Sequence, residues 1–331
     1  MAHQKREGSS ADDDCTSKRL KGTDTASETG GSVEASVSQQ MDAEARRTCQ
    51  KESEVSGEQK MVLTAVEADA AEDKGCRHTM EDTWVVLPDG DAESPGSLRC
   101  AHFAIYDGHG GRLAADYAQK HLHQNVIAAG LPRELMDVKA AKKAVIEGFR
   151  RTDESLRKKV LKEIGKMVRQ LYVVVANAGD AKAVLARSIS TEGEGVVDET
   201  KSQLKAIVLT REHKAIFPLE RSRIQKAGGS VGSNGRLQGR IEVSRAFGDR
   251  QFKKVGLIAT PDVHSFELTK KDHFIILGCD GLWGVFGPGD AVEFVQNQLK
   301  EASSATLAVR RLVKEAVRER RCKDNCTAVL I

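Results

Sequence analysis

Short apolar segments of this 331-residue chain repeatedly meet an aspartate that stands beside a glycine or an asparagine. Asp107 and Asp280 each follow such a segment, and Asp324 stands just before another. The segments are typical of β-strands, and aspartates at strand ends can converge on one point although they lie far apart in the sequence. Carboxylate oxygens without thiolates or a histidine cluster suit hard cations such as Mg²⁺ or Mn²⁺. Taken singly, each aspartate is equally consistent with a turn residue or a helix cap.

Strands and helices are predicted in blocks rather than in strict alternation. Apolar runs predict strands at 81–87, 100–106, 171–176, 181–186, 204–209, 273–278 and 326–331, and helical spacing predicts helices at 112–128, 134–163, 219–226, 290–299 and 307–320. Such blocks favour antiparallel sheets with helices packed outside them. The sequence therefore predicts an α+β fold.

Residues 1–57 differ in composition from the rest of the chain. They contain no Phe, Trp, Tyr, Ile or Pro. A segment of this kind buries too little apolar surface to offset its ordering entropy, so we expect a disordered tail followed by a folded domain at 58–331. Two basic clusters in the tail, 5–6 and 18–21, have the spacing of a bipartite nuclear import signal. We therefore expect the protein in the nucleus, the cytoplasm or both.

Charge and hydropathy argue against several classes of partner. A net charge of +3 gives no reason to expect nucleic-acid binding, and no apolar run approaches the length of a membrane span. The first residues lack the apolar core of a signal peptide. The seven cysteines include no CxxC pair, which favours reduced thiols over a zinc site. We expect a monomer that binds neither nucleic acid nor membrane.

Eight short motifs follow one another between residues 61 and 331. They are RHTMED (77–82), DGHGG (107–111), ANAGD (176–180), ERSRI (220–224), SRAFGD (244–249), TPD (260–262), DGLW (280–283) and KDN (323–325). In these eight motifs and in their order, the chain resembles the metal-dependent protein phosphatases of the 2C type. The stretch 223–253 is similar to plant members and to the integrin-linked-kinase-associated phosphatases of that family.

The resemblance implies a fold and a metal centre. The fold is a pair of packed, mainly antiparallel sheets flanked by helices, with two Mg²⁺ or Mn²⁺ ions at one end between the sheets. By this resemblance the ions are held by Asp107, which bridges both, by the backbone oxygen of Gly108, and by Asp280 and Asp324, with Glu81 and Asp82 reaching them through or beside bound water.

The resemblance also implies an activity, the hydrolysis of phosphoserine and phosphothreonine in phosphorylated proteins by metal-activated water. Arg77 has the planar fork that grips phosphate oxygens, and His109 is placed to protonate the departing serine or threonine oxygen. Outside these motifs, Arg77 would more often be a surface charge and His109 a polar turn residue. Cys279 lacks the phosphate cradle of cysteine phosphatases, and Ser244 lacks the GxSxG turn of serine hydrolases.

Of two departures from the family pattern, the weaker is Gly284, where many members have an aspartate, and the stronger concerns a strand. The family has a strand, led by an Asp-Gly-Ser/Ala-Thr-Ala motif, before the strand that ends at ANAGD. Here only residues 164–170 separate the predicted helix from that strand, and a strand with its turn needs about 8–10 residues. The sequence therefore predicts that one strand is missing near 164–170. A phosphatase-fold protein that binds or regulates partners with little turnover is the alternative function.

Overall fold

The computed structural model describes residues 66–88, 101–131, 133–134, 137–156, 167–168, 172–189, 203–302 and 304–331. The predicted tail and its two basic clusters lie outside these residues, so the disorder and the nuclear location stay predictions. Among the described helices, none is long and apolar enough to cross a membrane.

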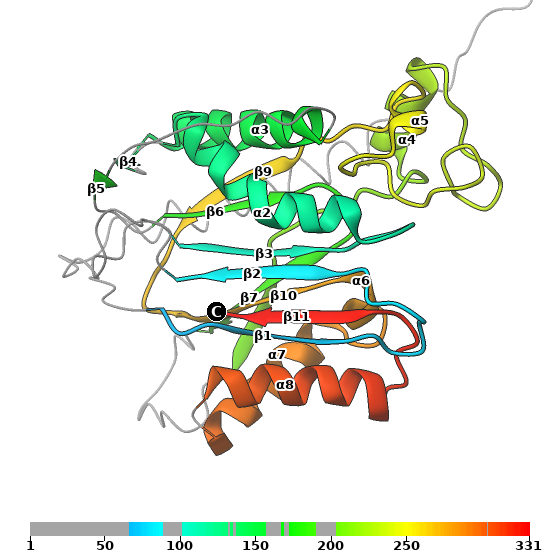
Figure 1. Cartoon of the computed structure of the whole chain (residues 1–331). Helices are drawn as coiled ribbons and strands as arrows, with labels where there is room; N and C mark the ends of the chain where they lie inside the picture. The colour runs from blue at the N-terminus through cyan, green and yellow to red at the C-terminus, as the bar shows by residue number, and fades with distance from the viewer. Residues whose placement is uncertain are drawn as a thin grey trace, which may run out of the picture. The chain divides into compact units, whose positions relative to one another are not determined.

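The larger sheet has five antiparallel strands. Their order is β1 (Asp69–Asp73), β11 (Cys326–Leu330), β10 (Asp272–Gly278), β7 (Lys182–Ser188) and β8 (Leu204–Val208). Helices α7 (Pro288–Ala302) and α8 (Ala305–Lys314) pack on this sheet (Figure 1). β11 is buried at every position because it lies between two strands and beneath α8.

A second layer contains two antiparallel pairs of strands. β2 (Thr83–Leu87) pairs with β3 (His102–Tyr106), and β6 (Tyr172–Asn177) pairs with β9 (Asp262–Glu267). Helices α2 (Leu113–Ala128) and α3 (Val138–Ser155) cover both pairs with one shared core (Figure 1). That core includes Val85, Tyr106, Leu122, Phe149, Val174 and Val263.

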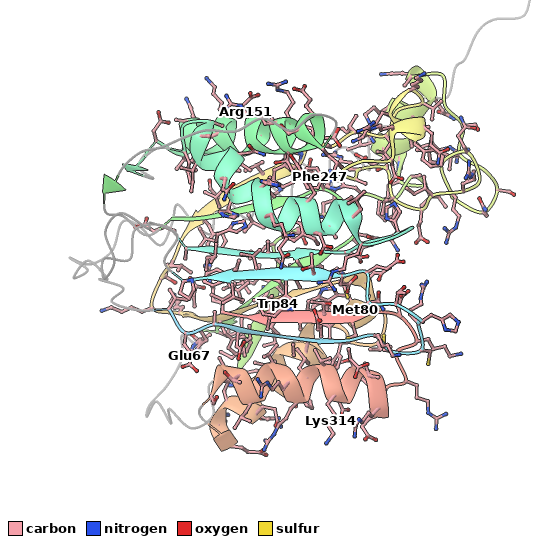
Figure 2. The ribbon with its side chains drawn as sticks, viewed as in Figure 1. Glu67, Met80, Trp84, Arg151, Phe247 and Lys314 are labelled. Carbon is pink, nitrogen blue, oxygen red and sulfur yellow. The ribbon has the colours of Figure 1, made fainter. Side chains whose placement is uncertain are left out.

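The two layers pack against each other, as the sequence predicted for an α+β fold. β11 lies against β2 and β3. Trp84 of β2, labelled in Figure 2, donates its indole N–H to Glu72 of β1 at 2.9 Å. The prediction of packed, mainly antiparallel sheets flanked by helices is confirmed.

The second layer is interrupted between β3 and β6. In the described part of the chain, β3 pairs only with β2, and β6 pairs only with β9. Both strands lead towards the same acidic cluster, β3 into Asp107 and β6 towards Asp180. Loss of a strand before β6 would leave such an interruption. The short β5 (Met167–Val168) pairs instead with β4 (Arg133–Glu134).

The residues between β8 and β9 form a smaller lobe. It contains α4 (Pro218–Lys226) and α5 (Arg250–Lys253). Its own core consists of Ala215, Ile224, Leu237, Phe252 and Leu257.

Several boundaries differ from the sequence prediction. The helix predicted at 134–163 is observed at Val138–Ser155, where the N-cap Asp137 accepts a hydrogen bond from the Ala140 N–H. The helix predicted at 307–320 is α-helical only to Lys314 and continues as a π-helical turn, η2 (Glu315–Glu319). α6 (Asp280–Trp283) is a single turn that follows β10.

Candidate active site

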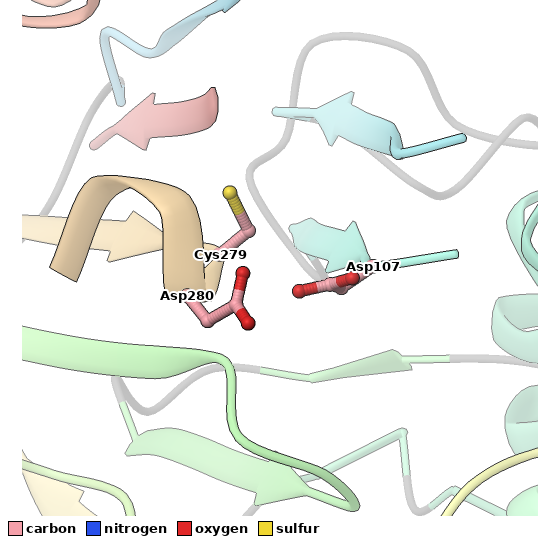
Figure 3. Close-up of side chains that lie close together, drawn as sticks. All are labelled: Asp107, Cys279 and Asp280. Carbon is pink, nitrogen blue, oxygen red and sulfur yellow. The ribbon is translucent and has the colours of Figure 1, made fainter. Parts of the chain in front are cut away.

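Asp107 and Asp280 meet at the end of the two layers. Asp107 follows β3, and Asp280 begins α6 directly after β10. A carboxylate oxygen from each and the thiol of Cys279 lie within 4.8 Å of one another (Figure 3). The structure therefore brings together two of the aspartates that strand ends predicted to converge.

The Asp107 carboxylate is in an electrostatically unfavourable place without a cation. Its Oδ2 atom is buried and has no hydrogen-bond partner among the described residues. Burial and the charges of nearby carboxylates raise its pKa to about 9. These carboxylates belong to Asp82, Asp280 and Asp180. A buried acceptor without a donor needs an explanation, and a cation between facing carboxylates supplies one.

Asp280 and Asp180 show the same effect more weakly. Burial, followed by the charge of Asp324, raises the pKa of Asp280. Burial, followed by the charge of Asp280, raises the pKa of Asp180 to about 6. Lys214, whose Nζ lies 4.0 Å from Asp180 Oδ2, opposes the rise for both carboxyls. The cluster therefore consists mainly of acidic groups whose carboxylates are partly shielded from water.

Asp82 and Glu81 lie next to the cluster, Asp82 near Asp107 and Glu81 against Gly108. Asp82 is almost fully buried and accepts a 2.7 Å hydrogen bond from the Thr327 hydroxyl, while its burial raises its pKa. The Glu81 backbone N–H donates to Asn325 Oδ1 at 2.8 Å. These two bonds attach the segment before β2 to the start of β11.

Two glycines allow the motif loops to pack backbone against backbone. A Cβ atom on Gly108 would lie 2.2 Å from the backbone oxygen of Glu81, and one on Gly281 would lie 2.0 Å from that of Asn325. Real Cβ atoms do not approach an oxygen so closely, so glycine is required at both positions. Gly108 therefore brings the backbone of the DGHGG loop against that of Glu81.

Asp324 lies beside the cluster and pairs with Arg77. The Arg77 Nη2 atom lies 2.5 Å from Asp324 Oδ2, and both side chains are exposed. The hydrogen bond and charge of Asp324 raise the pKa of Arg77. Asp324 is close enough to raise the pKa of Asp280, although it is not in the tightest group of ligand atoms.

His109 is held by a carboxylate that sequence reasoning did not single out. Its Nε2 atom lies 2.7 Å from Asp249 Oδ2, and this hydrogen bond raises the pKa of the imidazole. Asp249 belongs to the SRAFGD motif, whose place in the site the sequence left unassigned. Asp180 was also missed, although it follows an apolar strand as Asp107 does.

Cys279 and Ser244 have structural surroundings. Cys279 is fully buried, accepts a hydrogen bond from the Thr327 N–H, and donates one to the Asn325 carbonyl. Burial raises its pKa well above the usual value, which keeps it a protonated thiol. Ser244 is fully buried and donates its hydroxyl proton to the Glu220 carboxylate, and the His213 carbonyl oxygen lies 3.0 Å from its Oγ atom. Both residues serve packing rather than nucleophilic attack.

Comparisons with known proteins agree on one family. The family model "Protein phosphatase 2C" matches residues 66–326. The chain is 70 % identical to "Probable protein phosphatase 2C 67" of Oryza sativa subsp. japonica, over 100 % of this chain and 99 % of that protein. It is 35 % identical to "Integrin-linked kinase-associated serine/threonine phosphatase 2C" of Homo sapiens, over 82 % of this chain and 73 % of that protein.

A solved structure shares the fold. It is the "serine-threonine phosphatase 2C from Toxoplasma gondii", with a TM-score of 0.65 and 23 % identity, covering 82 % of this chain and 96 % of that one. The alignment with the rice protein extends over 363 positions, whereas this chain has 331 residues, so at least 32 positions have no residue of this chain.

Proposed function

The chain belongs to the protein phosphatase 2C family, and on that premise we propose that it hydrolyses phosphoserine and phosphothreonine in proteins at the acidic cluster. Members of this family are metal-dependent serine/threonine phosphatases. The observation that carries the assignment of the site is the buried Oδ2 of Asp107, which lacks a hydrogen-bond donor in the described residues and belongs to a group that includes Asp280.

The donor set fits two hard divalent cations. Mg²⁺ and Mn²⁺ prefer carboxylate, carbonyl and water oxygens, and the cluster offers carboxylates. When bound, the ions would neutralise phosphate charge and lower the pKa of water. The residues that would hold them are Asp107, the backbone oxygen of Gly108, Asp280 and Asp324, with Glu81 and Asp82 acting through water. Cys279 is left out of this set because these hard ions prefer oxygen, and its Sγ atom hydrogen-bonds the Asn325 carbonyl and the Thr327 N–H.

The chain's own residues orient the substrate and move one proton. Arg77 presents an exposed guanidinium, which can donate two parallel hydrogen bonds to phosphate oxygens. As water oxygen attacks phosphorus, the bond from phosphorus to the serine or threonine oxygen breaks. The imidazolium of His109 gives its proton to that oxygen, and the proton released by the attacking water restores the imidazolium. The products are the free hydroxyl and inorganic phosphate.

A turnover assay with metal control tests this proposal. The wild-type chain should hydrolyse a phosphothreonine peptide with Mn²⁺ and stop when EDTA is added. Asp107→Asn should lower kcat by about 100-fold or more, because a neutral amide cannot balance two divalent ions. Asp116→Asn is the matched control, since Asp116 forms an exposed pair with Arg112 at the start of α2 and contributes no atom to the group of Asp107, Cys279 and Asp280. If Asp107→Asn kept half of the wild-type rate at saturating Mn²⁺, the metal assignment would be wrong.

One observation favours the alternative, a binding protein of the same fold with little turnover. The interruption between β3 and β6 lies in the layer whose strands lead to Asp107 and Asp180. Calorimetry separates the two functions. A chain that binds phosphopeptide with Mn²⁺ but releases no phosphate over hours is a binding protein, and multiple turnovers identify an enzyme.

A further inference from the structure

We propose that Asp249 is a positioning residue, which holds the His109 imidazole through Nε2 and thereby leaves Nδ1 to face the departing oxygen of the substrate. This inference rests on the proposed function. The two side chains come from distant loops, and His109 Nε2 lies 2.7 Å from Asp249 Oδ2. Nδ1 makes no hydrogen bond with any described residue, so it is free to donate.

The contact with Asp249 determines which ring nitrogen of His109 is left to donate a proton to the leaving oxygen. An imidazole that donates one N–H to a carboxylate keeps its ring orientation. In hydrolase triads the buried aspartate holds the histidine in this way. Half of the His109 side chain is exposed, so without Asp249 the ring would rotate among several orientations. A fixed ring places the donating nitrogen near the leaving oxygen in each encounter.

Asp249 itself adopts an uncommon backbone conformation. Its φ is 47°, in the left-handed region, where non-glycine residues are rare and Asp and Asn are the best tolerated. Gly248 before it also has positive φ, 72°. Two consecutive left-handed residues turn the chain sharply before α5, and this turn directs the Asp249 carboxylate towards the DGHGG loop.

The turn is supported from α3. The Gly248 N–H donates to Asp153 Oδ1 at 2.8 Å, and the other oxygen of Asp153 lies 3.1 Å from Lys253 Nζ. Phe247, labelled in Figure 2, stacks on Phe149 of α3 with ring centroids 5.2 Å apart. Several contacts thus maintain a strained position beside His109, which is how proteins retain such strain at working sites.

The leaving group of the substrate separates a positioning role from a structural one. A serine alkoxide needs a proton as it departs, whereas the nitrophenolate of p-nitrophenyl phosphate is stable without one. Asp249→Asn keeps the size and the tolerance of left-handed backbone but removes the carboxylate. We expect its kcat on a phosphoserine peptide to fall at least 30-fold, with less than about 3-fold loss on p-nitrophenyl phosphate.

Controls make each outcome decisive. Asp116→Asn should change neither rate, and Asp249→Gly, which relieves the backbone strain, should behave as Asp249→Asn does if only the carboxylate matters. Equal losses on both substrates, or no loss on either, would overturn the proposal. A wild-type chain inactive on both substrates would instead contradict the proposed phosphatase function.

A spectroscopic measurement covers the case in which the variants fold poorly. In ¹⁵N-labelled wild-type protein without metal, His109 should show a slowly exchanging Nε2 proton, because that proton is held by Asp249. The signal is assigned by its loss in His109→Gln. A slowly exchanging proton on Nδ1 of His109, or no slowly exchanging proton on this ring, would overturn the proposal whatever the activity of the protein.

Discussion

The guanidinium of Arg77 lies 2.5 Å from the carboxylate of Asp324, although 246 residues separate the two in the sequence. The pair joins the segment before β2 to the loop before β11, and the same loop supplies Asn325, which binds the Glu81 N–H. Asp324 therefore fixes the side chain proposed to grip phosphate while its charge acts on Asp280.

Arg77→Ala should weaken phosphate binding more than the chemical step. Charge-assisted hydrogen bonds are worth about 1.5–3 kcal/mol, so we expect kcat/KM on a phosphopeptide to fall about 10- to 150-fold, chiefly through KM. Arg77→Lys should recover only part of this loss, because an ammonium cannot bind two oxygens in parallel. Arg112→Ala, which breaks an exposed pair with Asp116, is the control. An unchanged KM in Arg77→Ala would remove Arg77 from the phosphate site.

Gly281→Ala should destabilise the fold by about 1–3 kcal/mol through forced overpacking. The added Cβ would lie 2.0 Å from the Asn325 backbone oxygen, so the KDN loop must shift. Gly289→Ala is the matched control, because Gly289 lies in α7 with nothing within 4 Å of an added Cβ. That change should be neutral or stabilising by up to about 1 kcal/mol. Urea denaturation measures both, and similar stability of the two variants would contradict the predicted clash.

The buried carboxylate of Glu220 predicts a pH-dependent stability. Burial opposes its ionisation, but hydrogen bonds from Arg245, Ser244 and Arg223 outweigh it and lower its pKa to about 2. Because the folded pKa lies below the unfolded value of about 4.3, the contribution is fully present above that value. It is lost as the pH falls towards 2.

Glu220→Gln should therefore lower the free energy of unfolding by roughly 3 kcal/mol at pH 7. The gap from wild type should narrow as the pH falls from about 4.5 to 2, since the wild-type carboxyl then becomes neutral too. Glu301→Gln, at an exposed pair with Arg311, should cost less than about 1 kcal/mol at every pH. A Glu220→Gln gap that does not change with pH would show that its charge is unimportant.

The sequence predicted that Asp107 and Asp280 come together because their signal is local. An apolar run that ends at an aspartate marks a strand end, and the structure brings Asp107 and Asp280 together at such ends. Asp249 carries no such signal. Its contact with His109 depends on two consecutive left-handed residues and on Asp153 of α3, which only the tertiary structure brings together.

Strand β1 was missed for a related reason. Its sequence, DAAED, has low β-propensity and no apolar alternation, yet all five residues pair with β11. Pairing with a fully buried neighbour overrides the propensity of the segment. Likewise α3 ends at Ser155, earlier than its helical pattern indicates, where Leu156 accepts a hydrogen bond from Arg250.

The interruption between β3 and β6 predicts that a chain with an inserted strand at this place, called the repaired chain below, is more stable and more active. Residues 173–177 of β6 are only partly buried although three of them are valines, whereas β11 is buried throughout. A strand placed between β3 and β6 would add ladder hydrogen bonds on both sides and cover this apolar surface, at about 25 cal/mol per Å². It would also fix the two loops that carry Asp107 and Asp180.

The test inserts Asp-Gly-Ala-Thr-Ala followed by an apolar strand between Lys166 and Leu171. The direction is favourable. α3 ends near Asp249, and β3 and β6 run towards Asp107 and Asp180, so an inserted strand that joins the end of α3 to the start of β6 would run antiparallel to both neighbours. We expect a melting temperature higher by at least about 5 °C and a several-fold higher Mn²⁺-dependent kcat. An insertion of equal length made of Gly and Ser is the control. If the unmodified chain melts as high and turns over as fast as the repaired one, the missing strand is of no consequence for this fold, and its sheet tolerates two open edges.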